Sequence, residues 1–275
     1  MTSIASKILN IDRRIIWVTC IALIVWPLVS PIGLPMKVDE ITRKYYDAIE
    51  SLPPGSIVLA SIDIEAGLVG ENGAQCTDTL QHLFDKDIKF IQICFYRADG
   101  AILFENLWLP KVDQRDKVYG VDWVNIGYIE GHETAMTAFA ADFSYPVKDY
   151  YGNMLEGLQL MTEVKSMDDV DLYIDIAAGD CDQALRQFAT PYDVPAITGA
   201  MAMGVPDMIM YMEAGIVTGI LGGLPGAAQY ELLLNKPGAA IRGMDALSVV
   251  HIFLLCLVII TNLAYFSLRS KGEIK

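Results

Sequence analysis

The sequence predicts a Rossmann-like α/β domain placed between two apolar segments that are long enough to cross a membrane. Three observations support this. Short apolar stretches alternate with helical patterns in the middle of the chain, uncharged stretches lie near both ends, and 53% of the 275 residues are hydrophobic. A mean hydropathy of +0.36 is high for a soluble protein and low for a bundle of spans. We therefore expect one water-exposed domain held by a few membrane segments.

The middle of the chain contains five short stretches with strand character. They are 56–63, 88–96, 122–129, 170–178 and 194–200. Continuous apolar strands that alternate with helices are typical of a parallel sheet covered on both faces. We expect a sheet of about five strands with helices on both faces over 56–246, a linker helix within 35–55, and helices over about 205–235.

Two uncharged stretches are predicted to be transmembrane helices. They are 15–34 and 247–268, and about 20 helical residues cross the ~30 Å hydrocarbon core of a bilayer. A cleaved signal peptide is the alternative for the first stretch. However, the apolar run is long for a signal peptide, and no small-x-small cleavage motif follows it cleanly.

Basic residues flank both predicted spans on their outer sides. Arg13 and Arg14 precede the first, and Arg269 and Lys271 follow the second. By the positive-inside rule, tails 1–14 and 269–275 lie in the cytoplasm and the domain lies outside. The expected partners are the lipid bilayer and a second copy or a companion membrane subunit.

Three polar residues stand inside the second predicted span, His251, Thr261 and Asn262. In a bilayer, such groups usually hydrogen-bond to a neighbouring helix. Reaching the interface is the alternative for His251, which is close to one end of the span.

The charge and the cysteines exclude some classes of protein. The chain has 34 acidic and 20 basic residues, a net charge of −14, and a negative domain repels phosphate backbones. We expect no nucleic-acid partner. Five cysteines with no short spacing form neither a disulfide framework nor a zinc pattern, so we expect free buried thiols.

Acidic residues gather at the predicted carboxyl ends of the strands, where open α/β sheets bind ligands. No glycine-rich dinucleotide motif or P-loop follows the first strand, so no cofactor is expected. Oxygen ligands for a divalent cation are available instead. The candidates are Asp63, Glu65, Asp180 and Asp182. Helix capping and solvation are the alternative roles.

One pair of residues suggests covalent chemistry. His132 follows the third predicted strand and Cys181 the fourth. This placement is similar to that of caspase-like cysteine hydrolases, which implies Cys181 as nucleophile and His132 as base. The flanking carboxylates Asp180 and Asp182 oppose a thiolate, so an incidental cysteine is the alternative.

A glycine-rich segment over 213–231 is the most unusual stretch. Glycines at four-residue spacing give a helix a smooth face that another backbone can approach closely. The residues concerned are Gly215, Gly219, Gly222, Gly223 and Gly226. The helix can pack within its own domain, form an interface between subunits, or enter the membrane. We take these glycines as candidate interface residues.

Three motifs together resemble an uncharacterised group of prokaryotic two-span membrane proteins with a Rossmann-like domain. They are Arg13-Arg14 before the first span, GILGGLPGAAQYE over 219–231, and RGMD over 242–245. The resemblance covers most of the chain. It implies this architecture and the cytoplasmic membrane of a prokaryote, and it implies no activity.

These features favour a double-anchored membrane scaffold or assembly subunit rather than an enzyme. In this hypothesis the α/β domain self-associates or binds a partner. The alternatives are a membrane-anchored cysteine hydrolase with the pair Cys181 and His132, and a sensor that binds a cation or small ligand at the acidic loops.

Overall fold

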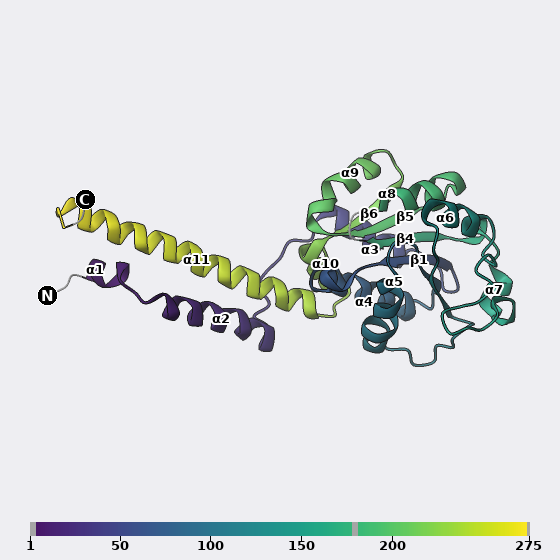
Figure 1. Cartoon of the computed structure of the whole chain (residues 1–275), viewed down its shortest axis with the longest axis horizontal. Coiled ribbons are helices and arrows are strands. Elements are labelled where there is room, and N and C mark those ends of the chain that lie inside the picture. The colour runs from purple at the N-terminus through teal and green to yellow at the C-terminus, as the bar shows by residue number, and fades with distance from the viewer. Residues whose placement is uncertain (1–3, 178–180, 274–275) are drawn as a thin grey trace. The chain divides into compact units, whose positions relative to one another are not determined.

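The computed structural model describes residues 4–177 and 181–273. These form two compact units, which are described separately. Met36–Lys236 make up the α/β domain. The two ends, Met1–Pro35 and Pro237–Lys275, make up a helical unit (Figure 1).

The α/β domain is built on one parallel sheet of six strands in the order β3-β2-β1-β4-β5-β6. The strands are β1 (Ile57–Asp63), β2 (Lys89–Cys94), β3 (Trp123–Tyr128), β4 (Leu172–Ala177), β5 (Ala196–Ala200) and β6 (Val217–Gly222). The first five confirm the predicted strands. The strand order runs outward in both directions from β1 and β4, as in doubly wound folds.

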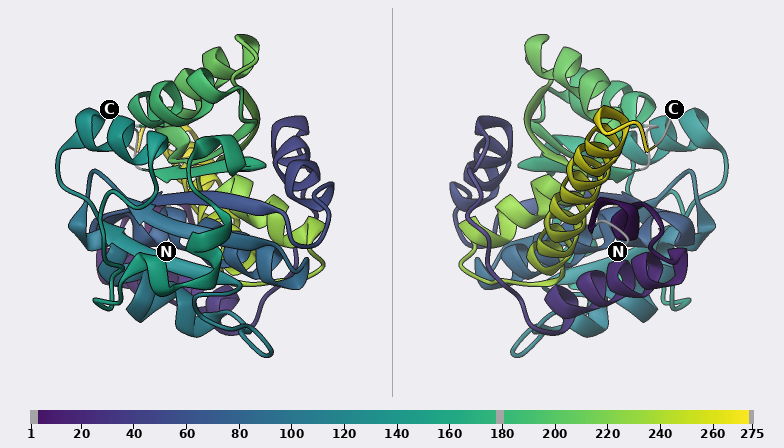
Figure 2. Two further views of the ribbon diagram at one scale, coloured as in Figure 1. Left: turned by 90° about the vertical axis from the view of Figure 1, so that its right-hand side faces the viewer. Right: turned by 90° about the vertical axis from the view of Figure 1, so that its left-hand side faces the viewer.

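Helices cover both faces of the sheet, as expected (Figure 2). They are α3 (Glu40–Glu50), α4 (Val69–Asp85), α5 (Ala98–Leu103), α6 (His132–Ala141), α7 (Gln159–Glu163), α8 (Cys181–Ala184), α9 (Val205–Glu213) and α10 (Gly223–Leu233). The π-helical turns Phe104–Trp108 and Leu185–Ala189 extend α5 and α8. One apolar core contains Phe139 of α6 and Met208 of α9, and the other contains Ile49 of α3 and Leu80 of α4.

The prediction of helices across 205–235 is wrong between Val217 and Gly222, which form the edge strand β6. A Cβ at Gly219 would lie only 2.2 Å from the backbone nitrogen of Tyr45 in α3. The glycine is therefore required by the close packing of a helix against a strand. For the same reason α3, expected as a linker helix, belongs to the domain.

The five candidate interface glycines do not share a helix face. Gly219, Gly223 and Gly226 are buried inside the domain. Gly215 is exposed in a turn with φ +77°, and Gly222 is half-buried beside Val205. The helical pattern that motivated the interface hypothesis is absent, because these residues belong to a turn, a strand and the start of α10.

The helical unit consists of α1 (Ile4–Leu9), α2 (Arg13–Val29) and α11 (Ala239–Ser270). Among the described residues, α11 is the one helix that is long and apolar enough to cross a membrane. At ~1.5 Å per residue, its 32 residues extend about 48 Å. The N-terminal helix α2 has 17 residues and ends at Val29, before the predicted limit at Leu34.

Candidate functional site

The sheet offers one edge where a ligand site is expected, the carboxyl ends of β1 and β4, because the strand order reverses there. β1 ends at Asp63, whose side chain is 1% exposed. Its carboxylate accepts hydrogen bonds from the backbone N–H groups of Phe95 (2.8 Å), Tyr96 (3.1 Å) and Arg97 (3.1 Å). Asp63 therefore holds the loop after β2 in place.

Burial raises the pKa of Asp63 to about 6, although the three N–H groups and the Ser61 hydroxyl favour the charged form. A carboxylate enclosed by four donors has little freedom to bind a cation. The sequence correctly predicted Asp63 at the end of a strand, but its carboxylate contacts the backbone of the loop after β2 and the Ser61 hydroxyl.

The ends of β5 and β6 are tied together by a side chain that sequence reasoning missed. Gln75 of α4 donates through Nε2 toward the carbonyl oxygens of Ala200 (3.2 Å), Leu221 (3.3 Å) and Gly223 (3.0 Å). A Cβ at Gly199 would lie 2.6 Å from the Gln75 Oε1. The space over these strand ends is thus filled by the chain itself. A single glutamine in an amphipathic helix gives no sequence signal for such a role.

A row of buried polar side chains crosses the sheet beneath the carboxyl edge. Ser61 of β1 pairs in register with Asp175 of β4, and Asp175 pairs with Thr198 of β5. All three are 0% exposed. The hydroxyl of Thr198 has no hydrogen-bond partner among the described residues. Buried polar groups are normally paired, so the Thr198 hydroxyl is an exception in this row.

Cys181 and His132 do not have the features of a catalytic pair. Cys181 is 0% exposed at the start of α8. Burial raises the pKa of its thiol well above the ordinary value, and the nearby Asp175 carboxylate raises it further. His132 is exposed at the start of α6, and no contact within the described residues joins it to Cys181. These contacts give the hydrolase hypothesis no support, and it stays a prediction that the reactivity of Cys181 tests.

We expect Cys181 to be inert toward iodoacetamide at pH 7, because the thiolate is disfavoured and the sulfur is inaccessible. The measurement uses a Cys20→Ser/Cys256→Ser background, in which the three remaining cysteines are all buried in the domain. Mass spectrometry should find no alkylation until the protein is denatured. Alkylation of folded Cys181 faster than that of a free thiol would restore the hydrolase hypothesis.

The predicted metal ligands are dispersed or already used. Glu65 lies 3.9 Å from Arg97, and Asp182 lies 3.3 Å from Arg186. Asp180 lies outside the described residues. Within 4–177 and 181–273, no group of three or more His, Cys, Asp or Glu side chains is arranged to hold a metal ion.

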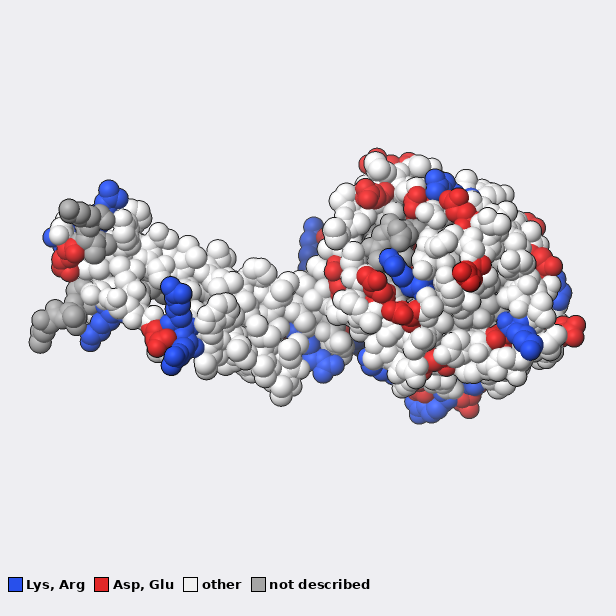
Figure 3. Space-filling model, in the orientation of Figure 1, with Lys and Arg blue, Asp and Glu red and all other residues white. Residues whose placement is uncertain are grey.

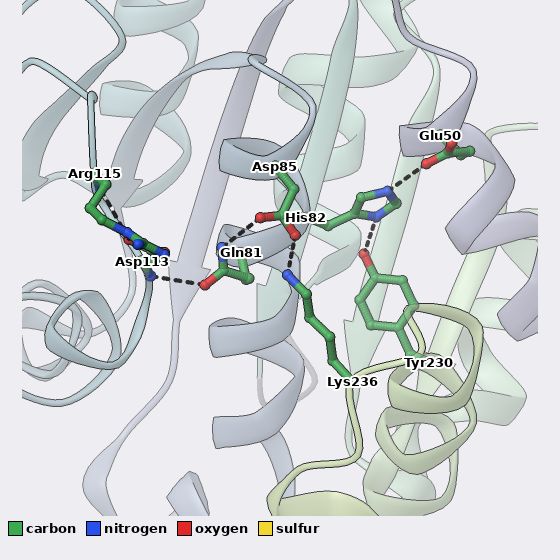
Figure 4. A network of polar contacts seen from close by, with 8 residues as sticks. All are labelled: Glu50, Gln81, His82, Asp85, Asp113, Arg115, Tyr230 and Lys236. Carbon is green, nitrogen blue, oxygen red and sulfur yellow. Dashed lines mark hydrogen bonds and ion pairs between the residues drawn. The ribbon is translucent and has the colours of Figure 1, made fainter.

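A polar network joins α4 to α3 and α10 (Figure 4). The buried His82 lies between Glu50 Oε2 at 3.0 Å and the Tyr230 hydroxyl at 2.7 Å. Burial lowers the pKa of His82, against the opposing effect of Glu50. Farther along α4, Asp85 contacts Lys236. The network fastens α10, the last helix of the domain, to the domain core.

Asp78 makes the stability of this region dependent on pH. Burial and the charge of Glu231 raise its pKa to about 8, from an ordinary 3.8. The folded state then keeps a proton that the unfolded state releases, so this carboxyl lowers stability progressively as the pH rises from about 4 to about 8.

We expect Asp78→Asn to be close to neutral at pH 4 and to stabilise the protein by about 1–2 kcal/mol at pH 8, allowing for partial solvent screening. Thermal unfolding in detergent at the two pH values checks this. Asp85→Asn, on the same helix, is the control and should show no gain toward pH 8. A stabilisation by Asp78→Asn that is equal at both pH values would contradict the assignment.

The helical unit contains a second cluster of contacts, centred on Asp245 of α11. Asp245 is 2% exposed. Its carboxylate accepts hydrogen bonds from the backbone N–H groups of Ile32 (2.9 Å), Gly33 (2.8 Å) and Leu34 (3.0 Å). These residues directly follow α2, so one side chain ties the two ends of the chain together. We call this contact the Asp245 clamp.

Of the three polar residues predicted within the second span, His251 and Asn262 lie on the exposed surface of α11, and Thr261 is half-buried. His251 Nδ1 lies 2.7 Å from the Leu247 carbonyl oxygen, and Asn262 Nδ2 donates to the Val258 carbonyl at 2.8 Å. Both of these bonds are to carbonyl oxygens of α11 itself.

The fold and these contacts define a class of protein: a doubly wound α/β domain joined to a helix that is long and apolar enough to cross a membrane. Compared with protein families, curated proteins and solved structures, the chain matches none of them.

Proposed function

We propose that this chain is a double-anchored membrane scaffold or assembly subunit, held by the segments 15–34 and 247–268, whose α/β domain binds a partner or a second copy. The observation that carries the proposal is the Asp245 clamp. It joins the end of α2 to α11, so that the two apolar segments form one unit.

The exposed surface of the helical unit supports a lipid environment. Trp17 and Val18 of α2 are 66% and 67% exposed, and Leu255 and Leu263 of α11 are 63% and 66% exposed. On the side drawn in Figure 3, a stretch without charged residues follows the charged end of the helical unit. Contiguous apolar surface of this kind needs a cover, and a bilayer provides it.

α2 is short for a transmembrane helix, but the Asp245 clamp provides hydrogen-bond acceptors for the backbone that follows it. The 15 residues of α2 that follow Arg14 reach about 22 Å, which is less than the hydrocarbon core. Beyond Val29 the backbone is no longer helical. Non-helical backbone is tolerated in lipid only where its N–H and C=O groups are hydrogen-bonded. Asp245 satisfies three of them directly after Val29 and Ser30.

Several features of the domain support binding through its outer surface. The carboxyl edge of the sheet is occupied by Asp63 and Gln75. The edge strand β3 is covered at Asn125, whose carbonyl accepts from Tyr150 N at 2.9 Å. By contrast, Met203 just before α9 and Met210 within α9 are 79% and 63% exposed. Methionine side chains adapt well to the surface of a binding partner.

The orientation is also part of this proposal. Arg13 and Arg14 open α2, and Arg269 lies in the last turn of α11, so both basic flanks belong on the cytoplasmic side. The domain then faces outside in the cytoplasmic membrane of a prokaryote. Membership of the uncharacterised two-span group named above remains a prediction.

The proposal is tested by washing native membranes with alkaline carbonate, followed by gentle detergent extraction and mass measurement. We expect the chain to resist the wash and to leave the membrane as an assembly larger than its 30.3 kDa mass. Release by the wash would contradict the anchors. A monomer at micromolar concentration would contradict assembly.

A small-ligand sensor is the second candidate, favoured by the unpartnered hydroxyl of Thr198 beside Asp175. Calorimetry with Ca²⁺, Mg²⁺ and Zn²⁺ tests the cation form of this hypothesis. A binding heat that disappears in Thr198→Val would support it, and no heat with any of the three ions would count against it.

A further inference from the structure

α11 presents a continuous face that carries the polar side chains of His251 and Asn262. His251 and Asn262 are three helical turns apart and lie within about 20° of one line along the helix. Leu255 (63% exposed), Val258 (56%) and Phe266 (58%) lie on the same face. We call these five residues the Asn262 face.

The Asn262 face points away from the rest of the helical unit. The residues of the same helix portion that are buried, Ala264 and Leu268, lie on the other side of α11. Leu257 and Thr261, which are half-buried, continue that side. The packing partners of α11 within the helical unit therefore leave the Asn262 face open.

Exposure of the Asn262 face to lipid is energetically unfavourable because Asn262 lies within the hydrocarbon region. It lies about 9 Å inside the end of the segment 247–268, at ~1.5 Å per residue. Its amide nitrogen is paired with the Val258 carbonyl, but its carboxamide oxygen accepts no hydrogen bond from the residues that the structure describes. A polar group without a partner in hydrocarbon is unfavourable, and association with a neighbouring helix relieves it.

A second copy of the same helix has the chemistry that this face needs. A carboxamide is both donor and acceptor, so two asparagines related by a two-fold axis satisfy each other. Two copies inserted in the same orientation also bring residues of equal depth together, which places Val258 opposite Val258 and Asn262 opposite Asn262.

We propose that α11 pairs with α11 of a second copy through the Asn262 face, with reciprocal hydrogen bonds between the two Asn262 side chains. The inference rests on the proposed function, because it requires α11 to lie in a membrane. It adds the identity of the partner and the residues that make the contact.

The experiment is oxidative cross-linking in native membranes, in a Cys20→Ser/Cys256→Ser background that removes the two cysteines of the helical unit. Val258→Cys places a thiol on the Asn262 face. Ile260→Cys is the matched control, because Ile260 is also exposed (47%) and close in depth but about 160° away around the helix.

We expect Val258→Cys to give at least about ten times more disulfide-linked dimer than Ile260→Cys. Adding Asn262→Leu, which keeps the helix apolar, should reduce the Val258→Cys dimer about fivefold or more. Equal cross-linking at the two positions, or none at Val258→Cys, would overturn the pairing. A product whose mass differs from twice that of the chain would also overturn it and would indicate a companion subunit.

A carbonate wash of the same membranes separates this inference from the function on which it rests. If the protein stays in the membrane and Val258→Cys remains monomeric, only the pairing fails. If the protein is released by the wash, the anchors fail as well.

Discussion

Asp245→Ala should separate the two ends of the chain and cost about 3–5 kcal/mol of stability. The substitution removes three hydrogen bonds to a buried carboxylate and leaves the N–H groups of Ile32, Gly33 and Leu34 without a partner. Bonds to charged groups contribute about 1.5–3 kcal/mol each, and unpaired buried donors add a penalty of their own. In a bilayer, water is scarce and cannot replace the lost acceptor.

Two measurements in detergent micelles check this expectation. The melting temperature should fall by about 10 °C, and trypsin should cut at Lys37, which follows the clamp, faster than in the unaltered protein. Asp12→Ala is the control, because Asp12 is an exposed cap that accepts one N–H, from Arg14, with an expected loss of about 1 kcal/mol. Equal losses for the two variants would mean that the clamp has no special role.

Gly219→Ala should destabilise the α/β domain by at least about 3 kcal/mol, although it adds a single methyl group. The new Cβ would lie 2.2 Å from the nitrogen and 2.4 Å from the Cα of Tyr45. Both atoms are backbone, so no side-chain rotation relieves the overlap. α3 would have to move away from β6 and expose Tyr45 and Ile49, which are 0% exposed.

Denaturant unfolding followed by tryptophan fluorescence measures this loss. Gly215→Ala provides the control, since Gly215 has open space around its Cβ position and only its φ of +77° is unfavourable for alanine. We expect about 1 kcal/mol there. If Gly219→Ala were tolerated as well as Gly215→Ala, the packing of α3 on β6 would be wrong.

Five strands were predictable because each is an apolar run bounded by turn residues. This pattern is local and can be recognised without knowledge of tertiary contacts. β6 was missed because its glycines recur at helical spacing. Gly219 in fact permits the contact with α3, which is more than 160 residues earlier in the chain, and the local sequence does not reveal such a contact. The end of α2 at Val29 agrees with Pro31, which disfavours a helical conformation at Ser30, but the contact of the following residues with Asp245 of α11 was not predictable.

The sequence predicted where the candidate site residues lie in the fold, but not what their side chains contact. Asp63 was expected at the end of a strand, and it is there, but its oxygens are occupied by backbone N–H groups. Cys181 was expected in a strand-end loop, and its burial depends on side chains from several elements. Gln75, Asp78 and Asp245 are single polar residues in ordinary surroundings, and only the fold shows that each is buried against distant backbone or charge.

The central claim is that both apolar segments cross the membrane and leave the domain on one side. Three variants test it most directly, each with one added exposed cysteine in a background that lacks Cys20 and Cys256 and keeps only the three buried cysteines of the domain: Lys7→Cys, Asp116→Cys and Lys271→Cys. A membrane-impermeant maleimide should label Asp116→Cys in intact cells, and should label Lys7→Cys and Lys271→Cys only after permeabilisation. Labelling of the two end positions from opposite sides, or equal labelling of all three in intact cells, would contradict a double-anchored protein.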